Sequence, residues 1–229
     1  MKVVQSSAAK MKLVGGQLCL DFVNTVDGRK SYSTRANSVS ANNVLGDKLE
    51  NYFDLVEWSR HAGIITTPES RRLIEEGRRQ ASEAGKVFAR AIALREALYR
   101  VFKLVMAHRP PQNVDLDTVN DELQRARSHE RLIRADDGFT WEWTGAATAL
   151  DRMLWSIAHS GAEYLTSGDF SRLRECGSEE CGWLFEDTSK NRSRQWCHMQ
   201  DCGNLEKVRR FRARKQLGSK TIPTRAYTK

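Results

Sequence analysis

The chain has 229 residues, of which 40% are hydrophobic and 29% are charged, and its formal net charge is +8. This composition is ordinary for a globular protein and excludes a chain that is disordered throughout. No run approaches the roughly eighteen apolar residues of a membrane span, and the N-terminal residues lack the hydrophobic segment of a signal peptide. We therefore expect a cytoplasmic protein that has no membrane partner.

The positive charge is concentrated near the C-terminus. Residues 188–229 contain 12 Lys or Arg and 2 acidic residues, whereas residues 1–187 contain 25 basic and 27 acidic residues. The balance is therefore +10 in the C-terminal segment and −2 before it. Such a segment indicates either an anionic partner, above all nucleic acid, or a solvated surface that keeps the protein soluble.

Helical periodicity dominates the chain up to about residue 168. In the clearest case, apolar residues from Val87 to Val105 recur at intervals of three and four, and Pro110 ends the pattern. Thr67-Pro68-Glu69 is typical of a helix start. The helices that we expect cover residues 18–26, 47–63, 71–80, 86–107, 114–128 and 146–166.

One part of the body departs from this helical pattern. Residues 131–135 and 139–143 alternate in polarity and flank Asp136-Asp137-Gly138, a sequence typical of a tight turn between antiparallel strands. We expect a small β-hairpin there. The predicted N-terminal domain, over residues 1–170, is thus helical with one hairpin.

Four cysteines follow this domain in two Cys-x4-Cys pairs, Cys176 with Cys181 and Cys197 with Cys202. In a reducing compartment such pairs bind metal more often than they form disulfides. Four thiolates complete the tetrahedral shell of Zn²⁺ and leave no position for water, so the ion would be structural. His198 is an alternative ligand because it adjoins Cys197.

A segment of about 45 residues has too small a core to fold without such an ion. We expect a treble-clef-like zinc finger over residues 171–217, followed by a basic, flexible tail over 218–229. It would contain a hairpin within residues 182–196 and a helix capped by Asp201 or Asn204. The apolar stripe expected to pack on that hairpin is Leu205, Val208 and Phe211. The predicted fold class is therefore mainly α, in the α+β sense.

Basic residues of the finger form a candidate nucleic-acid surface. Lys207, Arg210 and Arg214 share one face of the predicted helix, because they are spaced by three and four. Cations gathered on one face bind phosphates, and Arg can bridge two phosphate oxygens. The full set of candidates is Lys190, Arg192, Arg194, Lys207, Arg209, Arg210, Arg212, Arg214 and Lys215.

The body offers a second candidate site, formed by Asp21, Asn24, Thr25 and Arg95. The first three share a face of a short helix, and Arg95 lies at the edge of the apolar face of its own helix. Either these groups line a pocket for a small-molecule effector, or Asp21 and Arg95 form a buried ion pair that stabilises the core.

No catalytic pattern stands out in the sequence. Cys19 is either a small buried hydrophobic residue or a reactive or metal-binding thiol, and the sequence shows no group that would activate it. The sequence contains no Ser-His-Asp set, glycine-rich phosphate loop or HExxH motif. We therefore expect that the protein is not an enzyme.

Two stretches carry a family resemblance. The segment from Cys181 to Asn204, followed by Lys207-Val-Arg-Arg-Phe-Arg-Ala-Arg, resembles the CGNR zinc finger, although Leu205 stands where the motif's name has Arg. Leu18-Cys-Leu-Asp-Phe-Val-Asn-Thr and Leu94-Arg-Glu-Ala-Leu-Tyr resemble the ABATE domain that usually accompanies it. The resemblance implies a bacterial, stress-induced transcriptional regulator whose finger binds DNA, with RNA binding also suspected in the family.

Together these observations predict a zinc-dependent transcriptional regulator. The finger would contact duplex DNA, and the helical body would sense a ligand or mediate association, for example as a homodimer. Two alternatives stay open. The protein could bind RNA instead of DNA, or it could be a module for protein interaction or ligand binding in which the finger is purely structural.

Overall fold

A computed structural model describes residues 6–29 and 46–218 of the chain. The part of the predicted C-terminal tail from residue 219 onward lies outside the described residues. The elements are η1 (Ser7–Lys10), α1 (Leu18–Val23), α3 (Tyr52–His61), α4 (Thr67–Arg79), α5 (Ala81–Met106), α6 (Asn113–Arg127), β1 (Glu130–Ala135), β2 (Gly138–Trp143), α7 (Arg152–Ser167), η2 (Phe170–Arg172), β3 (Leu173–Glu175), β4 (Leu184–Glu186), η3 (Met199–Gly203) and α8 (Asn204–Gly218). The predicted fold class is confirmed.

Local sequence signals explain where several helices begin. At the start of α4, Thr66 and Glu69 form a capping box, in which each side chain accepts a hydrogen bond from the other residue's backbone N–H, and Pro68 occupies the first turn. The side chain of Asn51 caps α3 by accepting from two backbone N–H groups. Helix α5 begins at Ala81, five residues before the predicted start.

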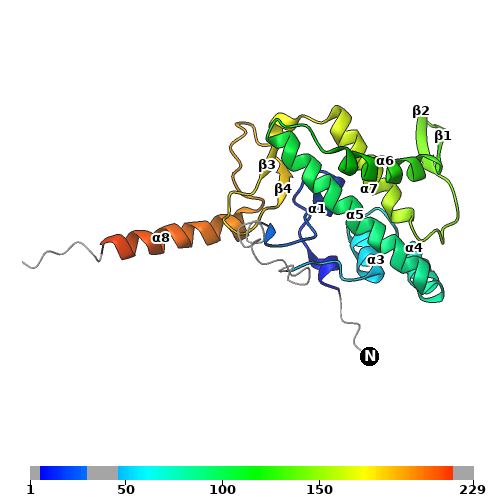
Figure 1. Cartoon of the computed structure of the whole chain (residues 1–229), viewed down its shortest axis with the longest axis horizontal. Coiled ribbons are helices and arrows are strands. Elements are labelled where there is room, and N and C mark those ends of the chain that lie inside the picture. The colour runs from blue at the N-terminus through cyan, green and yellow to red at the C-terminus, as the bar shows by residue number, and fades with distance from the viewer. Residues whose placement is uncertain (1–5, 30–45, 219–229) are drawn as a thin grey trace, which may run out of the picture.

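The core of the body forms around α5, the longest helix (Figure 1). Leu94, Leu98 and Phe102 of α5 are fully buried, as are the large side chains of Trp58 and Trp155. Helices α1, α3, α4, α6 and α7 all contact α5. The apolar periodicity of residues 86–107 therefore identified the central helix of the molecule. Among the described residues, no helix is both long enough and apolar enough to cross a membrane.

The predicted hairpin is confirmed as the antiparallel pair of β1 and β2. Leu132 pairs with Trp141 and Arg134 pairs with Phe139, so these side chains share one face of the hairpin. Leu132, Phe139 and Trp141 are more than half exposed. Figure 1 shows that this hairpin and α8 lie at opposite ends of the molecule.

The other pair of strands, β3 and β4, joins the finger to the body. Leu184 of β4 belongs to the main hydrophobic core. The Asn24 side chain donates to the Leu184 carbonyl at 2.7 Å and accepts from the Leu184 N–H at 2.8 Å. The N–H of Glu186 donates to the Gly15 carbonyl at 2.8 Å. The N-terminal residues thus satisfy the open edge of β4, and the two segments share one core.

The hairpin predicted within residues 182–196 is wrong. Strand β4 pairs with β3, which precedes the first cysteine, so the strand pair spans the Cys176–Cys181 knuckle. The chain after β4 folds around the buried carboxylate of Asp187 instead. This carboxylate accepts from the N–H groups of Ser189 and Arg194, both at 2.9 Å. A side chain rather than a partner strand satisfies these backbone groups.

Candidate zinc centre and nucleic-acid interface

The structure brings the four predicted zinc ligands together. The Sγ atoms of Cys176, Cys181, Cys197 and Cys202 all lie within 4.8 Å of one another. The Sγ atom of Cys197 is 3.7 Å from that of Cys181 and 3.6 Å from that of Cys202. A tetrahedron with Zn–S bonds of about 2.3 Å has sulfur–sulfur edges of about 3.8 Å. The four cysteines therefore form a structural zinc site.

The secondary structure around the site explains how the ligands converge. Cys176 follows β3 directly, and its N–H donates to the Trp183 carbonyl at 2.8 Å. Gly182 has a φ of +74°, a left-handed conformation that lets the chain turn sharply after Cys181. The N–H of Cys197 donates to the Cys176 sulfur at 3.4 Å. Hydrogen bonds from the Cys181 and Cys197 thiols lower the pKa of Cys176.

The alternative ligand, His198, lies outside the sulfur cluster that the described residues form. Its Nδ1 atom is 3.0 Å from the carboxylate of Asp201, which also pairs with Lys12 at 2.7 Å. The Asn204 side chain donates to the Gln200 carbonyl at 3.1 Å. Asp201 and Asn204 therefore have other partners than the helix N–H groups that they were predicted to cap.

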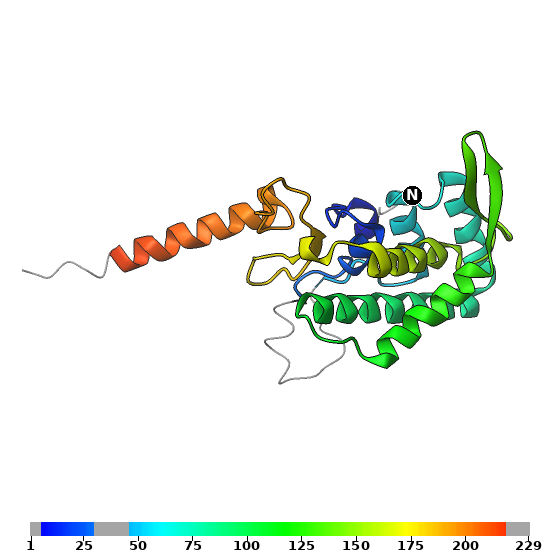
Figure 2. The same ribbon diagram turned by 90° about the horizontal axis from the view of Figure 1, so that it is seen from above.

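Helix α8 turns its apolar residues away from the finger, so the predicted packing of its apolar stripe is wrong. Leu205, Val208 and Phe211 are 46%, 45% and 69% exposed. Glu206 faces the finger instead, accepting from the Ser178 hydroxyl at 3.1 Å. Because this part of the knuckle presents polar donors, a carboxylate satisfies it better than a leucine would. Figures 1 and 2 show α8 extending away from the body.

Most of the candidate nucleic-acid residues are exposed. Arg194 and Arg209 are half-buried, and Arg209 is paired within the finger with Glu206 and Glu180, both at 3.0 Å. Arg192 is exposed but lies 3.5 Å from the carboxylate of Asp169. Lys190 is exposed in the loop after β4. The exposed candidates on α8, which form no ion pair among the described residues, are Lys207, Arg210, Arg212, Arg214 and Lys215.

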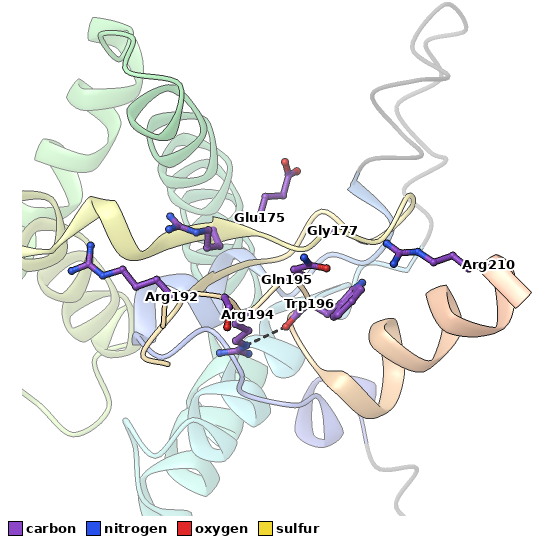
Figure 3. A pocket seen from close by; sticks show the side chains of 9 residues that line it. Glu175, Gly177, Arg192, Arg194, Gln195, Trp196 and Arg210 are labelled. Atoms are coloured by element: carbon purple, nitrogen blue, oxygen red, sulfur yellow. Dashed lines mark hydrogen bonds between the residues drawn. The ribbon is translucent and has the colours of Figure 1, made fainter. Parts of the chain in front are cut away.

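Arg194 connects several backbone segments. Its guanidinium donates to the carbonyl of Cys197 and, at 3.1 Å each, to the carbonyls of Trp196 and Val14. The same group lies 4.2 Å from the centre of the Phe185 ring. Figure 3 shows this side chain and its bond to Trp196. These contacts give Arg194 a structural role between the finger and the N-terminal segment.

An open cleft of about 410 Å³ lies beside the zinc site (Figure 3). Its lining contains Trp196, the predicted candidates Arg192, Arg194 and Arg210, and also Arg174. Sequence reasoning missed Arg174 because it precedes the first cysteine and the basic segment. Its place two residues before the zinc ligand Cys176 is the signal that could have found it.

The four candidate pocket residues of the body are held by contacts within the protein. Arg95 pairs with Asp47 through two bonds of 2.7 and 2.8 Å and donates to Thr25 Oγ1 at 3.1 Å. Asp21 accepts from the Gly15 N–H at 2.8 Å, and its burial raises its pKa to about 6. The predicted Asp21–Arg95 pair is therefore wrong. With Asn24 bound to β4, all four residues have hydrogen-bond partners within the protein.

Cys19 is a small buried hydrophobic residue. Its side chain is fully buried and belongs to the main core. Burial raises the pKa of its thiol to about 12, so the thiol stays protonated and is a poor nucleophile.

Two family models match the chain. A model described as "Putative stress-induced transcription regulator", the ABATE family, matches residues 16–168, and a model of the CGNR zinc finger matches residues 172–215. No curated protein matches. Neither family is described as a family of enzymes. Because the first match alone covers more than half of the sequence, the chain belongs to the ABATE family and carries a CGNR zinc finger around its four-cysteine site.

Proposed function

We propose that the protein is a zinc-dependent transcription regulator that binds duplex DNA through its finger and α8. The observation that carries the proposal is the row of exposed cations on α8, a helix that extends away from the body (Figure 2). A cluster of Lys and Arg on one element is the electrostatic footprint of a protein that binds phosphate backbones.

Several arginines inside the body are paired with carboxylates. Arg90 pairs with Glu122, Arg95 with Asp47 and Arg100 with Asp115, at distances of 2.6 to 2.7 Å. By contrast, Lys207, Arg212 and Arg214 form no ion pair with any described residue. Cations without a partner in the protein are available to an anionic partner.

The dimensions of α8 also suit DNA. Its 15 residues correspond to a length of about 22 Å at 1.5 Å per residue. The major groove of B-DNA is about 12 Å wide and admits one α-helix. Lys207, Arg210 and Arg214, spaced by three and four, can approach the backbone along one side of such a groove. The zinc site would fix the start of this helix.

The first test is equilibrium binding of the full-length, zinc-loaded protein to short duplex DNA at several salt concentrations. If about five or six phosphates are contacted, the slope of log K against log salt will be about −4 to −6. Stronger binding to single-stranded or structured RNA than to duplex DNA would contradict the proposal in its DNA form.

A matched pair of charge-reversal variants locates the surface. In the first, Lys207, Arg212 and Arg214 are changed to Glu, and we expect binding to fall to background. In the second, the exposed residues Arg71, Arg72 and Arg127 of the body are changed to Glu, which alters the net charge equally, and we expect a much smaller effect. Equal effects of the two variants would show that only the net charge matters.

A second candidate function is supported by the exposed apolar stripe of α8. Leu205, Val208 and Phe211 could contact a protein partner instead of DNA, since exposed apolar patches mark interaction sites. On this alternative, the charge-reversal variant of α8 would keep all nucleic-acid retention, while Phe211→Ser would abolish capture of the partner.

For the body we propose a role in association as a homodimer. The support is the exposed apolar face of the β1–β2 hairpin, with Leu132, Phe139 and Trp141. Because this face lies at the opposite end from α8, a second copy bound there would leave α8 free (Figure 1). The molar mass of the wild-type protein and of Trp141→Ser in solution tests this role. A monomeric wild-type protein would contradict it. The four candidate pocket residues form their contacts within the protein, and these contacts do not support a role for them in ligand sensing.

A further inference from the structure

Arginines from three separate segments line the cleft beside the zinc site. Arg174 comes from β3, Arg192 and Arg194 from the loop after β4, and Arg210 from α8. In Figure 3, Arg192 and Arg210 lie on opposite sides of the cleft, and Trp196 lies beside Arg210. Cations that converge from several segments on one concavity create a local positive potential that favours an anion.

Two of these arginines retain donors for a ligand. Arg174 donates to the Leu173 carbonyl at 3.0 Å, and the Arg210 guanidinium lies 5.9 Å from the centre of the Trp196 ring. Neither forms an ion pair within the part of the chain that the structure describes. Because a guanidinium has five N–H donors, each of the two can still bind an oxyanion through paired hydrogen bonds.

The rest of the lining is held in place before any ligand arrives. Glu175, which would repel an anion, is paired with Lys103 at 2.6 Å. Arg192 is bound at the rim by the Ser171 hydroxyl at 2.6 Å, and the N–H of Gly177 donates to the Gln195 carbonyl at 2.7 Å. Arg194 is tied to backbone carbonyls, so its wall of the cleft is supported by contacts within the protein. A preorganised site binds its ligand at a smaller cost in conformational entropy.

From these contacts we infer that the cleft binds a phosphodiester group of the nucleic-acid backbone, with Arg174 and Arg210 as its direct ligands and Arg192 at the rim. This inference rests on the proposed function and names a contact outside the basic C-terminal segment. Arg194 acts as a positioning residue that supports the wall of the cleft. A phosphate seated here would fix the register of α8 on the nucleic acid.

The cleft suits a polymer better than a small free anion. It is open rather than enclosed, and at about 410 Å³ it has room for a phosphate with its neighbouring sugars. Arg210 belongs both to the cleft and to the exposed cationic face of α8. A nucleic-acid backbone that enters the cleft can therefore continue along the cationic face of α8.

The test compares Arg174→Ala with the wild-type protein in binding to one short duplex DNA over a range of salt concentrations. Loss of one phosphate contact lowers the magnitude of the salt slope by about one and weakens binding roughly tenfold at about 0.1 M salt. Arg174→Lys, which keeps a point charge, should recover part of this loss. Arg72→Ala, at an exposed position on α4, is the matched control. Thermal denaturation and zinc content establish that each variant is folded.

Each outcome decides the inference. A lower affinity and a smaller slope for Arg174→Ala, with Arg72→Ala unchanged, support it. Wild-type affinity and slope for Arg174→Ala overturn the inference and leave the proposed function intact. If the wild-type protein binds no nucleic acid, the proposed function and the inference fail together. If millimolar AMP binds the wild-type protein but not Arg174→Ala, while both bind duplex DNA equally, the cleft holds a free nucleotide and the inference is overturned.

Discussion

Helices α5 and α8 carry apolar residues at similar helical spacing, but the apolar stripe of α5 is buried and that of α8 is exposed. In α5, Leu94, Leu98 and Phe102 are fully buried, whereas Val208 and Phe211 of α8 are 45% and 69% exposed. Helix α5 is surrounded by the other helices of the body, while α8 contacts chiefly the short π-helix η3. Periodicity thus predicts that a segment is helical, but only the surrounding elements decide whether its apolar face has a partner.

The largest difference between the two helices should appear when zinc is removed. Structural zinc contributes on the order of 10 to 16 kcal/mol to small modules. We expect chelation, or Cys202→Ser, to unfold the finger from β3 to η3 and so to free α8, while α5 keeps its structure. Hydrogen exchange measured by mass spectrometry reports both regions in one experiment. Retained protection in residues 173–203 without zinc would show that the shared core alone holds the finger.

A core substitution in α5 should have the next largest effect. Leu98 is fully buried and lies so close to α7 that a Cβ atom on Gly161 would be 2.8 Å from its Cδ2 atom. Because such tight packing relaxes little, Leu98→Ala should lower the free energy of unfolding by about 2 to 5 kcal/mol. Urea denaturation measures this change. A loss below about 1 kcal/mol would mean that the stripe of α5 is less important than its burial indicates.

The junction between body and finger should show an intermediate effect. Asn24→Ala removes both hydrogen bonds to Leu184 and leaves a buried N–H and a buried carbonyl without their partner. We expect a loss of about 1 to 3 kcal/mol, measured by urea denaturation of the zinc-loaded protein. The Asn51→Ala variant, which loses a cap on the surface of α3, is a control expected to lose about 1 kcal/mol. Equal stability of Asn24→Ala and the wild-type protein would show that the bonds between Asn24 and Leu184 do not stabilise the junction of finger and body.

The smallest effect is expected on α8 itself. Because Phe211 is mostly exposed, Phe211→Ser should change the free energy of unfolding by less than about 0.5 kcal/mol. The comparison with Leu98→Ala is direct, since both changes remove a large apolar side chain from a helix. A loss of several kcal/mol would show that the apolar face of α8 is covered in solution.

Signals local in sequence accounted for a large part of the fold. The apolar spacing around Leu94 and Leu98 marked the central helix, and Asp136-Asp137-Gly138 marked the turn of the confirmed hairpin. The cysteine spacing identified the zinc ligands. The helix and the turn depend on residues within a few positions of one another, and the zinc ligands on two pairs of closely spaced cysteines, so residue type and spacing are enough to predict them.

Contacts between distant residues could not be read in this way. The pairing of β4 with β3 depends on Asn24 and Gly15, more than 150 residues away, which satisfy its other edge. Arg194 had the charge of a nucleic-acid ligand, but its hydrogen bonds to the carbonyls of Val14, Trp196 and Cys197 give it a structural role. The sequence does not show which distant group a charged side chain will contact in the folded protein.

By itself, then, the sequence determined the helices, one hairpin, the zinc ligands and the concentration of positive charge, because each follows from residue type and spacing. Only the tertiary structure decided that the finger shares a core with the body, that α8 exposes its apolar residues, and which arginines remain unpaired. These features depend on which buried polar groups meet across the fold, and every such group must find a partner wherever the chain brings one.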